Sequence, residues 1–264
     1  MLRSGLVRDA IKHVLVDRVC ETNARPDVVT RWREPLLGFA AATDPLFLEL
    51  KRVVSPSHAL PIELLPGART VVAFFVPFER EVASSNFGGQ LASEGWARAY
   101  VETNRLIAEL CELLKGAFEG FGHETYVTPA THNYDPVTMV SDWSHRHVAH
   151  IAGLGTLGVH NLLITERGAC GRLGSCVTTA EIEPDRRPEV EGCLEKRGVS
   201  CLRCVRRCVG DALLGAGSFD RRRCQDVLHE NEAAHAAIGK ADVCGKCLVK
   251  VPCSHGIPRL KERD

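Results

Sequence analysis

Eight of the twelve cysteines in this chain lie between residues 193 and 253. They are Cys193, Cys201, Cys204, Cys208, Cys224, Cys244, Cys247 and Cys253. Two [4Fe-4S] clusters require two sets of four thiolates. The number and crowding of these residues therefore predict redox chemistry, in which iron–sulfur clusters carry single electrons.

The cysteine spacing can be compared with that of two-cluster ferredoxins, in which the fourth cysteine of each run binds the other cluster. With this crossover, the first predicted set is Cys193, Cys201, Cys204 and Cys253. The second predicted set is Cys208, Cys224, Cys244 and Cys247. All eight cysteines are used. The gap after Cys193 is longer than in bacterial ferredoxins, and Pro252 precedes Cys253 instead of following it.

Structural zinc is the main alternative, because C-x2-C pairs also bind this metal. The pairs Cys201/Cys204 and Cys244/Cys247 would supply one tetrahedral four-thiolate site. Such a site leaves four cysteines without a role. Disulfides are a further alternative, but they are typical of short secreted chains, and the N-terminal residues lack the apolar segment of a secretory signal.

The composition is that of an ordinary globular protein, with 45% hydrophobic and 25% charged residues in 264. This length accommodates one or two domains. Charges are scattered through residues 1–19, and no run of about 18 apolar residues occurs. We therefore expect a cytoplasmic protein that has no membrane partner.

Charge is balanced over the whole chain, with 33 basic and 33 acidic residues. Zero net charge does not support a tRNA partner, although it leaves one open. From residue 193 onward, 14 basic residues stand against 9 acidic ones, a net charge of +5. Positive charge there would stabilise thiolates and the negative clusters they hold, and a tRNA or an acidic partner surface is the competing explanation.

The distribution of cysteines predicts two domains, residues 1–180 and 181–264. The segment 181–192 is charged and contains two prolines, which is typical of a boundary. The first part mixes helix and strand patterns, whereas the second carries the eight crowded cysteines. We therefore expect an α/β layer followed by a small cluster-binding domain.

Apolar periodicity predicts the main elements of the first part. Helices are expected over 2–19, 44–54 and 93–118, and the β-branched run 70–76 is typical of a buried strand. Cys111 falls on the apolar stripe of the third helix, so core packing is its simplest role. Residues 161–165 and 175–178 also have the composition of strands.

Gly153, Gly155 and Gly158 match the dinucleotide fingerprint G-x-G-x-x-G. That fingerprint requires a strand before it and a helix after it, so that the pyrophosphate meets a helix N-terminus. Here a predicted helix over 143–152 precedes the glycines and a predicted strand follows. We therefore reject nucleotide binding and expect Gly153 and Gly155 to supply a helix C-cap and a tight turn.

Polar residues before this turn are candidates for a site. His145, Arg146 and His147 are candidates for the edge of a cofactor site by position, and solvated residues on an amphipathic helix are the alternative. Asp135 and Asp142 are candidates for a catalytic acid, and turn formation or helix N-capping is the alternative.

In combination, these features resemble the epoxyqueuosine reductases and their relatives. The resemblance rests on Ala-Gly-Leu-Gly at 152–155, Gly158, Asn-Leu-Leu-Ile-Thr at 161–165, the strand that ends at Thr178 and the order of the eight cysteines. It covers about residues 143–253. Met139 stands at the position expected for the family's acid, between Asp135 and Asp142, and Val159-His160 stand where the family usually has a lysine.

The resemblance implies an α/β (α+β) fold in which a nitroreductase-like, cobalamin-binding-type domain is joined to a small two-cluster ferredoxin-like domain. It implies two [4Fe-4S] clusters and a cobalamin, with Gly153 and Gly155 counted among the cofactor-binding candidates. It also implies an external electron donor, which would be a flavodoxin, a ferredoxin or a reductase. The expected substrate is a small molecule or a modified base.

Two functions follow from these observations. The first is an iron–sulfur oxidoreductase, similar to epoxyqueuosine reductase, that relays electrons through two clusters to a corrinoid or a similar cofactor. The second is a ferredoxin-type electron-transfer protein without catalysis of its own. About 180 residues before the cysteines exceed what cluster binding needs, which favours the enzyme.

Overall fold

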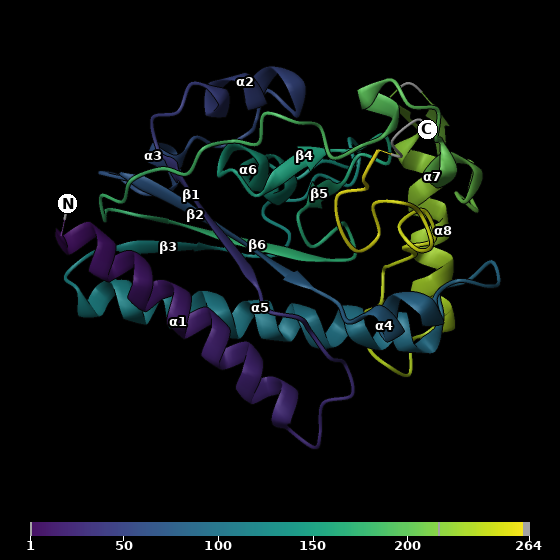
Figure 1. Ribbon diagram of the computed structural model, residues 1–264, viewed down its shortest axis with the longest axis horizontal. Coiled ribbons are helices and arrows are strands. Elements are labelled where there is room, and N and C mark those ends of the chain that lie inside the picture. Colours follow the sequence, from purple (N-terminus) through teal and green to yellow (C-terminus); the bar gives the residue numbers. More distant parts are fainter. Residues whose placement is uncertain (1, 216, 261–264) are drawn as a thin grey trace.

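The computed structural model describes residues 2–215 and 217–260. It has a mixed α/β fold around a four-stranded sheet (Figure 1). The strands lie in the order β1-β2-β6-β3, and each neighbouring pair is antiparallel. Their bounds are Leu36–Ala41 for β1, Thr70–Pro77 for β2, Gly171–Thr178 for β6 and Thr125–Thr128 for β3.

The two central strands are packed on both faces. All eight residues of β2 are buried, as its continuous apolar run predicts. Gly174 of β6 pairs with Phe74 of β2, and a Cβ at Gly174 would overlap the Phe74 ring. The glycine therefore leaves space that the aromatic ring fills.

Two long helices cover one face of the sheet and pack against each other (Figure 1). They are α1 (Leu2–Ala24) and α5 (Glu94–Gly120). Helix α5 begins after Ser93, whose hydroxyl accepts a hydrogen bond from the Trp96 amide at 3.1 Å. Its buried stripe includes Leu110, Cys111 and Leu114, so the packing role predicted for Cys111 is confirmed.

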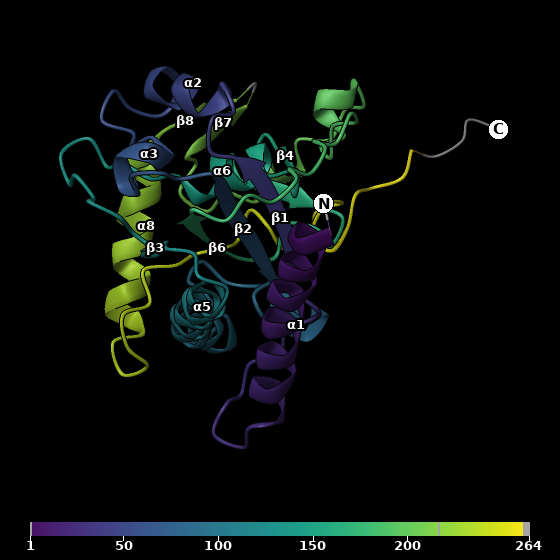
Figure 2. The same ribbon diagram turned by 90° about the vertical axis from the view of Figure 1, so that its left-hand side faces the viewer.

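The opposite face carries shorter elements (Figures 1 and 2). These are α2 (Leu46–Val53), α3 (Pro61–Leu64), α6 (His145–Ile151) and the hairpin of β4 (Gly155–Leu157) with β5 (Leu163–Thr165). Phe47 stacks on Trp143 with ring centroids 6.3 Å apart. The two rings belong to a second apolar core, which fixes α6 against the sheet.

The cysteine-bearing part lies at one end of the sheet, beside α4 (Arg80–Ser85) (Figure 1). Its elements are the 3-10 turn η1 (Glu195–Arg197), α7 (Arg203–Arg206), β7 (Leu213–Gly215), β8 (Ser218–Phe219) and α8 (Arg221–Ala234). The main hydrophobic core is shared, because it joins Phe74 and Trp96 to Cys204 and Leu248.

The segment 181–192 runs back along the sheet. The Phe39 amide of β1 donates to the Asp185 carboxylate at 3.0 Å, and the Asp185 amide donates to the Phe39 carbonyl at 2.8 Å. The Gly192 amide donates to the Thr156 hydroxyl at 2.7 Å. The chain thus passes from the sheet to the cysteines along a fixed path.

Most predicted elements of the first part are found. The helices expected over 2–19, 44–54 and 93–118 correspond to α1, α2 and α5, and the strand expected over 70–76 is β2. Strands β1 and β3 and helix α8 are not predicted from the sequence. Among the described helices, none combines the length and the apolar character needed to cross a membrane.

Candidate functional site

Two cavities in the C-terminal part are each lined by four cysteines. Cys208, Cys224, Cys244 and Cys247 line the larger cavity, which has a volume of about 280 Å³. Cys193, Cys201, Cys204 and Cys253 line the smaller one, of about 20 Å³. These groups are the two sets that the ferredoxin crossover predicts from spacing. The zinc alternative pairs Cys201/Cys204 with Cys244/Cys247, but these two pairs line different cavities.

Short helices and one close backbone contact position the larger set. Cys224 lies in the first turn of α8, whose N-cap Asp220 accepts the Arg223 amide at 3.1 Å. The Cys244 carbonyl accepts a hydrogen bond from the Asn86 side chain at 2.8 Å. Gly245 has a positive φ of 68°, and a Cβ there would overlap the Trp96 indole. Glycine thus lets this loop approach α5 closely.

The smaller set is held by contacts with the β4–β5 hairpin and the loop that follows it. The Cys253 carbonyl accepts the Ala169 amide at 2.9 Å. Its thiol lies 3.4 Å from Nε2 of His160. The Cys201 amide donates to the Glu195 carboxylate at 2.7 Å. Helix α7 joins the two cavities, because Cys204 lies within it and Cys208 follows two residues after it.

Burial favours the protonated form of three of these thiols. It raises the pKa of Cys204 and of Cys224 to about 11, and that of Cys253 to about 12. Neighbouring cysteines of the same set raise these pKa values further. Metal binding requires thiolates, so a bound metal centre must displace these protons.

The chemistry of the donor sets fits iron–sulfur clusters. Each cavity offers four thiols in largely apolar surroundings, as thiolate-ligated clusters require. Within the described ranges, no group of three or more His, Cys, Asp or Glu is arranged for a single metal ion.

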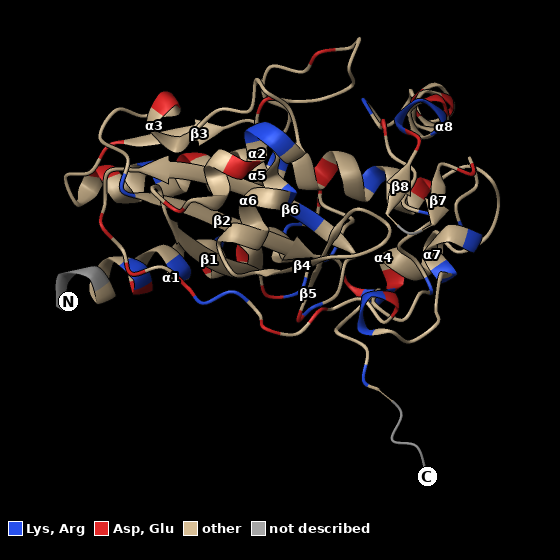
Figure 3. Cartoon of the chain, turned by 90° about the horizontal axis from the view of Figure 1, so that it is seen from above, with Lys and Arg blue, Asp and Glu red and all other residues tan. Residues whose placement is uncertain are grey.

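Basic side chains surround the cysteine loops, and Figure 3 shows Lys and Arg at α7. The Arg206 guanidinium donates to the Cys201 carbonyl at 2.6 Å. Arg207 donates to the Lys246 carbonyl at 3.1 Å and to the Phe87 carbonyl at 2.9 Å. These arginines therefore bind the backbone of the loops that carry the cysteines.

The three candidates on α6 contact protein groups. The two ring nitrogens of His145 lie 2.9 Å from the Ser175 hydroxyl and 2.9 Å from the Pro129 carbonyl. His147 contacts the Ser144 hydroxyl at 2.7 Å. Burial lowers the pKa of His145 to about 4 and that of His147 to about 3, so both rings are neutral at pH 7.

Arg146 also contacts a protein group, but it differs from the two histidines in its second contact. One of its terminal nitrogens donates to the Asn161 carbonyl at 2.9 Å. Its Nε is buried and has no hydrogen-bond partner among the described residues. Burial also lowers its pKa to about 10. An unpartnered buried guanidinium nitrogen is costly, so this side chain has an unused capacity to bind a polar group.

The two acid candidates lie in different surroundings. The Asp142 carboxylate is hydrogen-bonded to Nδ1 of His132 and accepts a hydrogen bond from the side-chain amide of Asn133 at 2.9 Å. The Tyr126 hydroxyl contacts the other His132 nitrogen at 2.9 Å, which gives a chain of three side chains. Asp142 caps no helix, because the N-cap of α6 is Ser144.

Asp135 lies in an exposed turn. Its carboxylate accepts the Val137 amide at 2.8 Å and the Thr138 hydroxyl at 2.8 Å. These two hydrogen bonds lower the pKa of Asp135, and the one from Thr138 has the larger effect. The adjacent Tyr134 hydroxyl reaches the Gln225 side chain of α8 at 3.3 Å. The loop that contains Asp135 therefore contacts α8, the helix that contains Cys224.

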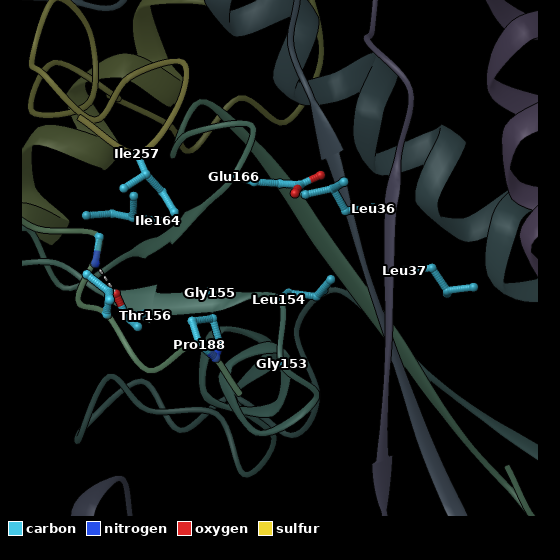
Figure 4. A pocket seen from close by; sticks show the side chains of 12 residues that line it. Leu36, Leu37, Gly153, Leu154, Gly155, Thr156, Ile164, Glu166, Pro188 and Ile257 are labelled. Atoms are coloured by element: carbon cyan, nitrogen blue, oxygen red, sulfur yellow. Dashed lines mark hydrogen bonds between the residues drawn. The ribbon is translucent and has the colours of Figure 1, made fainter. Parts of the chain in front are cut away.

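Gly153 and Gly155 line a third cavity, of about 340 Å³ (Figure 4). Gly153 ends α6 with a φ of 82°, and its amide donates to the His150 carbonyl at 3.0 Å, as a C-cap glycine does. A Cβ at Gly155 would overlap the Ile164 carbonyl of β5. The predicted order of a helix before the glycines and a strand after the turn is confirmed by α6 and β4, and it is the reverse of the order that the dinucleotide fingerprint requires.

Several residues that line the larger cavity belong to no motif in the sequence. Trp96 and Tyr100 come from α5, and Arg172 from β6. The Arg172 guanidinium lies 4.1 Å above the Tyr100 ring, and the Tyr100 hydroxyl donates to Asp242 at 2.6 Å. Lys246 does carry a signal, because it stands inside Cys244-x2-Cys247 and is buried. Helix and sheet packing bring the others there.

Known proteins that are similar to this chain include epoxyqueuosine reductases. The epoxyqueuosine reductase of Vibrio cholerae is 25% identical over 214 residues, which cover 78% of this chain and 56% of that protein. That of Lactococcus garvieae is 44% identical over 117 residues, 42% of this chain and 32% of the protein. This chain is therefore similar to the epoxyqueuosine reductases. It spans about half the length of the Vibrio protein, and no family model matches it.

Solved structures show the same fold. Epoxyqueuosine reductase from Streptococcus thermophilus superposes with a TM-score of 0.61 at 19% identity, over 100% of this chain and 69% of that chain. A catabolic reductive dehalogenase gives a TM-score of 0.58 at 16% identity, over 84% of this chain and 30% of that chain. A further neighbour is described as a reductive dehalogenase with a B12-dependent mechanism. The shared feature is the mixed α/β fold.

Proposed function

We propose that this protein is an oxidoreductase that relays electrons through two [4Fe-4S] clusters to a corrinoid. The observation that carries the proposal is the division of eight cysteines between two neighbouring cavities, four to each. The relationship to epoxyqueuosine reductases supports the same assignment. One cluster takes Cys193, Cys201, Cys204 and Cys253, and the other takes Cys208, Cys224, Cys244 and Cys247.

We further propose the two-part layout implied by the resemblance. Residues 1–180 form the nitroreductase-like part that holds the corrinoid, and 181–264 form the ferredoxin-like part. The fold shared with epoxyqueuosine reductases and B12-dependent dehalogenases supports this division. When bound, the clusters carry single electrons and the corrinoid supplies the reductant that breaks the substrate bond.

His145, Arg146 and His147 are proposed to lie at the corrinoid edge. The buried, unpartnered Arg146 Nε supports a polar ligand at this place. The neutral His147 would orient that ligand through Nε2, because its Nδ1 already contacts the Ser144 hydroxyl. Both ring nitrogens of His145 are engaged, so this residue would fix the edge of the site in place. Gly153 and Gly155 stay predicted cofactor contacts, although close chain packing already accounts for both.

The acid that protonates the substrate is proposed to be Asp142, with Asp135 as the second candidate. The hydrogen bond between Asp142 and His132 supports this choice, because His132 also contacts the Tyr126 hydroxyl, and the three side chains form a route along which a proton would reach the carboxylate. Asp135 instead lies on the loop tip. A Bacillus subtilis epoxyqueuosine reductase was solved with its aspartate-bearing catalytic loop swung out of the active site. Asp135 is kept as a candidate because it also lies on a loop, which would bring it to the site by a similar movement.

The proposed substrate is an epoxide on a modified base. One solved epoxyqueuosine reductase holds an epoxyqueuosine-modified tRNA stem loop. Two electrons and two protons convert an epoxide into an alkene and one molecule of water. The electrons would come from a flavodoxin, a ferredoxin or a reductase, and the protons from the acid residues and solvent. A ferredoxin-type carrier without catalysis is less well supported, because the curated relatives are reductases.

The test is anaerobic purification with iron, sulfide and zinc analysis, followed by a visible spectrum before and after addition of hydroxocobalamin. We expect about eight irons for two four-iron clusters and a shifted corrinoid spectrum. Arg146→Gln should weaken corrinoid binding, whereas the surface variant Arg187→Gln should not. Iron without a corrinoid response would favour the electron carrier, and zinc without iron would contradict both functions.

A further inference from the structure

The three tryptophans of the chain differ in their hydrogen bonds. Trp32 Nε1 donates to the Thr103 hydroxyl and Trp143 Nε1 to the Ser175 hydroxyl, each at 2.9 Å. Trp96 is only 3% exposed, yet its Nε1 has no acceptor among the described residues. A buried indole N–H without a partner costs about 1–3 kcal/mol, and buried tryptophans usually find one. The location of this nitrogen therefore requires an explanation.

The unpartnered nitrogen belongs to the wall of the larger cysteine-lined cavity. Trp96 lines that cavity together with Cys244 and Cys247. A Cβ on Gly245, the residue after Cys244, would overlap the indole at Nε1, Cε2 and Cζ2. The nitrogen edge of the ring therefore faces the Cys244-x2-Cys247 loop.

Neighbouring polar groups in the same wall are already engaged. The Lys246 ammonium donates to the Asn86 carbonyl at 3.2 Å and to the Gly88 carbonyl. The Tyr100 hydroxyl donates to the Asp242 carboxylate at 2.6 Å. Trp96 is fixed in place by an edge-to-face contact with Phe78, with centroids 5.2 Å apart. Its N–H is thus a rigid donor left over in a cavity of thiols.

We propose that the Trp96 indole N–H donates a hydrogen bond to a sulfur atom of the cluster held by Cys208, Cys224, Cys244 and Cys247, and thereby raises the reduction potential of that cluster. The inference rests on the proposed function. Reduction adds negative charge to the sulfurs, and a hydrogen bond to an anionic acceptor is stronger. The donor therefore stabilises the reduced cluster more than the oxidised one.

The effect belongs to one cluster. Trp96 does not line the smaller cavity, where the described polar neighbour of a thiol is His160, 3.4 Å from Cys253. The two clusters would therefore differ in potential by a contribution that a single side chain controls.

The test is a redox titration of the two clusters, followed by electron paramagnetic resonance, in Trp96→Phe and in the matched control Trp32→Phe. Both tryptophans are 3% exposed, but Trp32 has its own acceptor and does not line the larger cavity. We expect Trp96→Phe to lower the reduced-to-oxidised ratio of one cluster about tenfold at fixed potential, which is 59 mV for a one-electron couple. The other cluster, and both clusters in Trp32→Phe, should be unchanged.

Iron analysis separates this inference from the proposed function. Unmodified protein without cluster iron would contradict the proposed function. Eight irons with unchanged potentials in Trp96→Phe would overturn the role of Trp96 alone. If Trp96→Phe loses iron, benzothienylalanine at position 96 decides the question, because it keeps the ring shape and lacks only the N–H. A potential shift with this isostere supports the hydrogen bond, and no shift overturns it.

Discussion

The cysteine-lined cavities and the loop of residues 129–142 arrange their polar groups in different ways. In the cavities, four thiols of one kind gather around a space. In the loop, Asp142 is hydrogen-bonded to His132, which contacts Tyr126 of the adjacent strand β3, so these groups already pair with one another. The first arrangement is built to receive a ligand, whereas the second is built to hold a conformation. Loss of one thiol should therefore remove a whole centre, and loss of one loop residue should reduce a rate.

The largest expected effect tests the cavities. The single variants Cys247→Ala and Cys253→Ala should each lose about four of the eight irons, because a cluster needs all of its ligands. The exposed Cys20, replaced by alanine, should keep all the iron. Iron and sulfide analysis after anaerobic purification gives the result. Full iron content in either cavity variant would show that its cysteine is not a ligand.

The next effect tests the loop. Asp142→Asn should lower the single-turnover rate on an epoxide-bearing RNA stem loop by about 10²–10⁴-fold, the usual contribution of a positioned acid. Asp135→Asn should change the rate much less, because asparagine still accepts hydrogen bonds in the exposed turn. Iron content of both variants is the control. A larger loss of rate in Asp135→Asn than in Asp142→Asn would identify Asp135 as the acid.

A smaller effect tests the close approach of the larger cavity to α5. Gly245→Ala should destabilise the protein by about 1–3 kcal/mol, because the added methyl group overlaps the Trp96 ring. Gly116→Ala is the matched control, since nothing lies within 4 Å of a Cβ at that helical position. It should stabilise the protein by about 0.5–1 kcal/mol. Anaerobic urea unfolding measures both, and equal effects would contradict the contact.

The smallest effect concerns His147, one of the half-buried histidines of α6. Burial lowers the pKa of His147 to about 3, below its value in the unfolded chain. The unfolded chain therefore binds the proton first, and stability falls as the pH drops below about 6.5. Between pH 7.5 and 5.5 the wild type should lose about 1 kcal/mol more than His147→Asn. The exposed His13→Asn is the control, and a wild-type pH dependence in His147→Asn would contradict this burial.

The sequence predicts the cysteine sets because a cluster fixes both the type and the number of its ligands. Long periodic elements such as α5 and the apolar run of β2 are equally clear. Strands β1 and β3 are short and pair at the sheet edges, so their stability comes from the register with β2 and β6. Helix α8 is rich in charge, and its polar surface gives no apolar stripe to detect.

The polar contacts of the candidate site depend on tertiary structure. Nothing in the sequence around Trp96 indicates that its ring faces Gly245, about 150 residues away in the chain. The same is true of Arg146, whose unpartnered Nε appears only when α6 is packed. Gly245 offered one signal, because a glycine between two ligand cysteines is typical of a close backbone approach.

The crossover of the two cysteine sets is the central claim, and Cys204 and Cys208 test it most directly. They are four residues apart at α7 but line different cavities. Electron paramagnetic resonance of the reduced single-alanine variants should show Cys204→Ala matching Cys253→Ala and Cys208→Ala matching Cys247→Ala, each with one cluster of about four irons. Identical spectra for Cys204→Ala and Cys208→Ala would place both cysteines on one cluster and contradict the account.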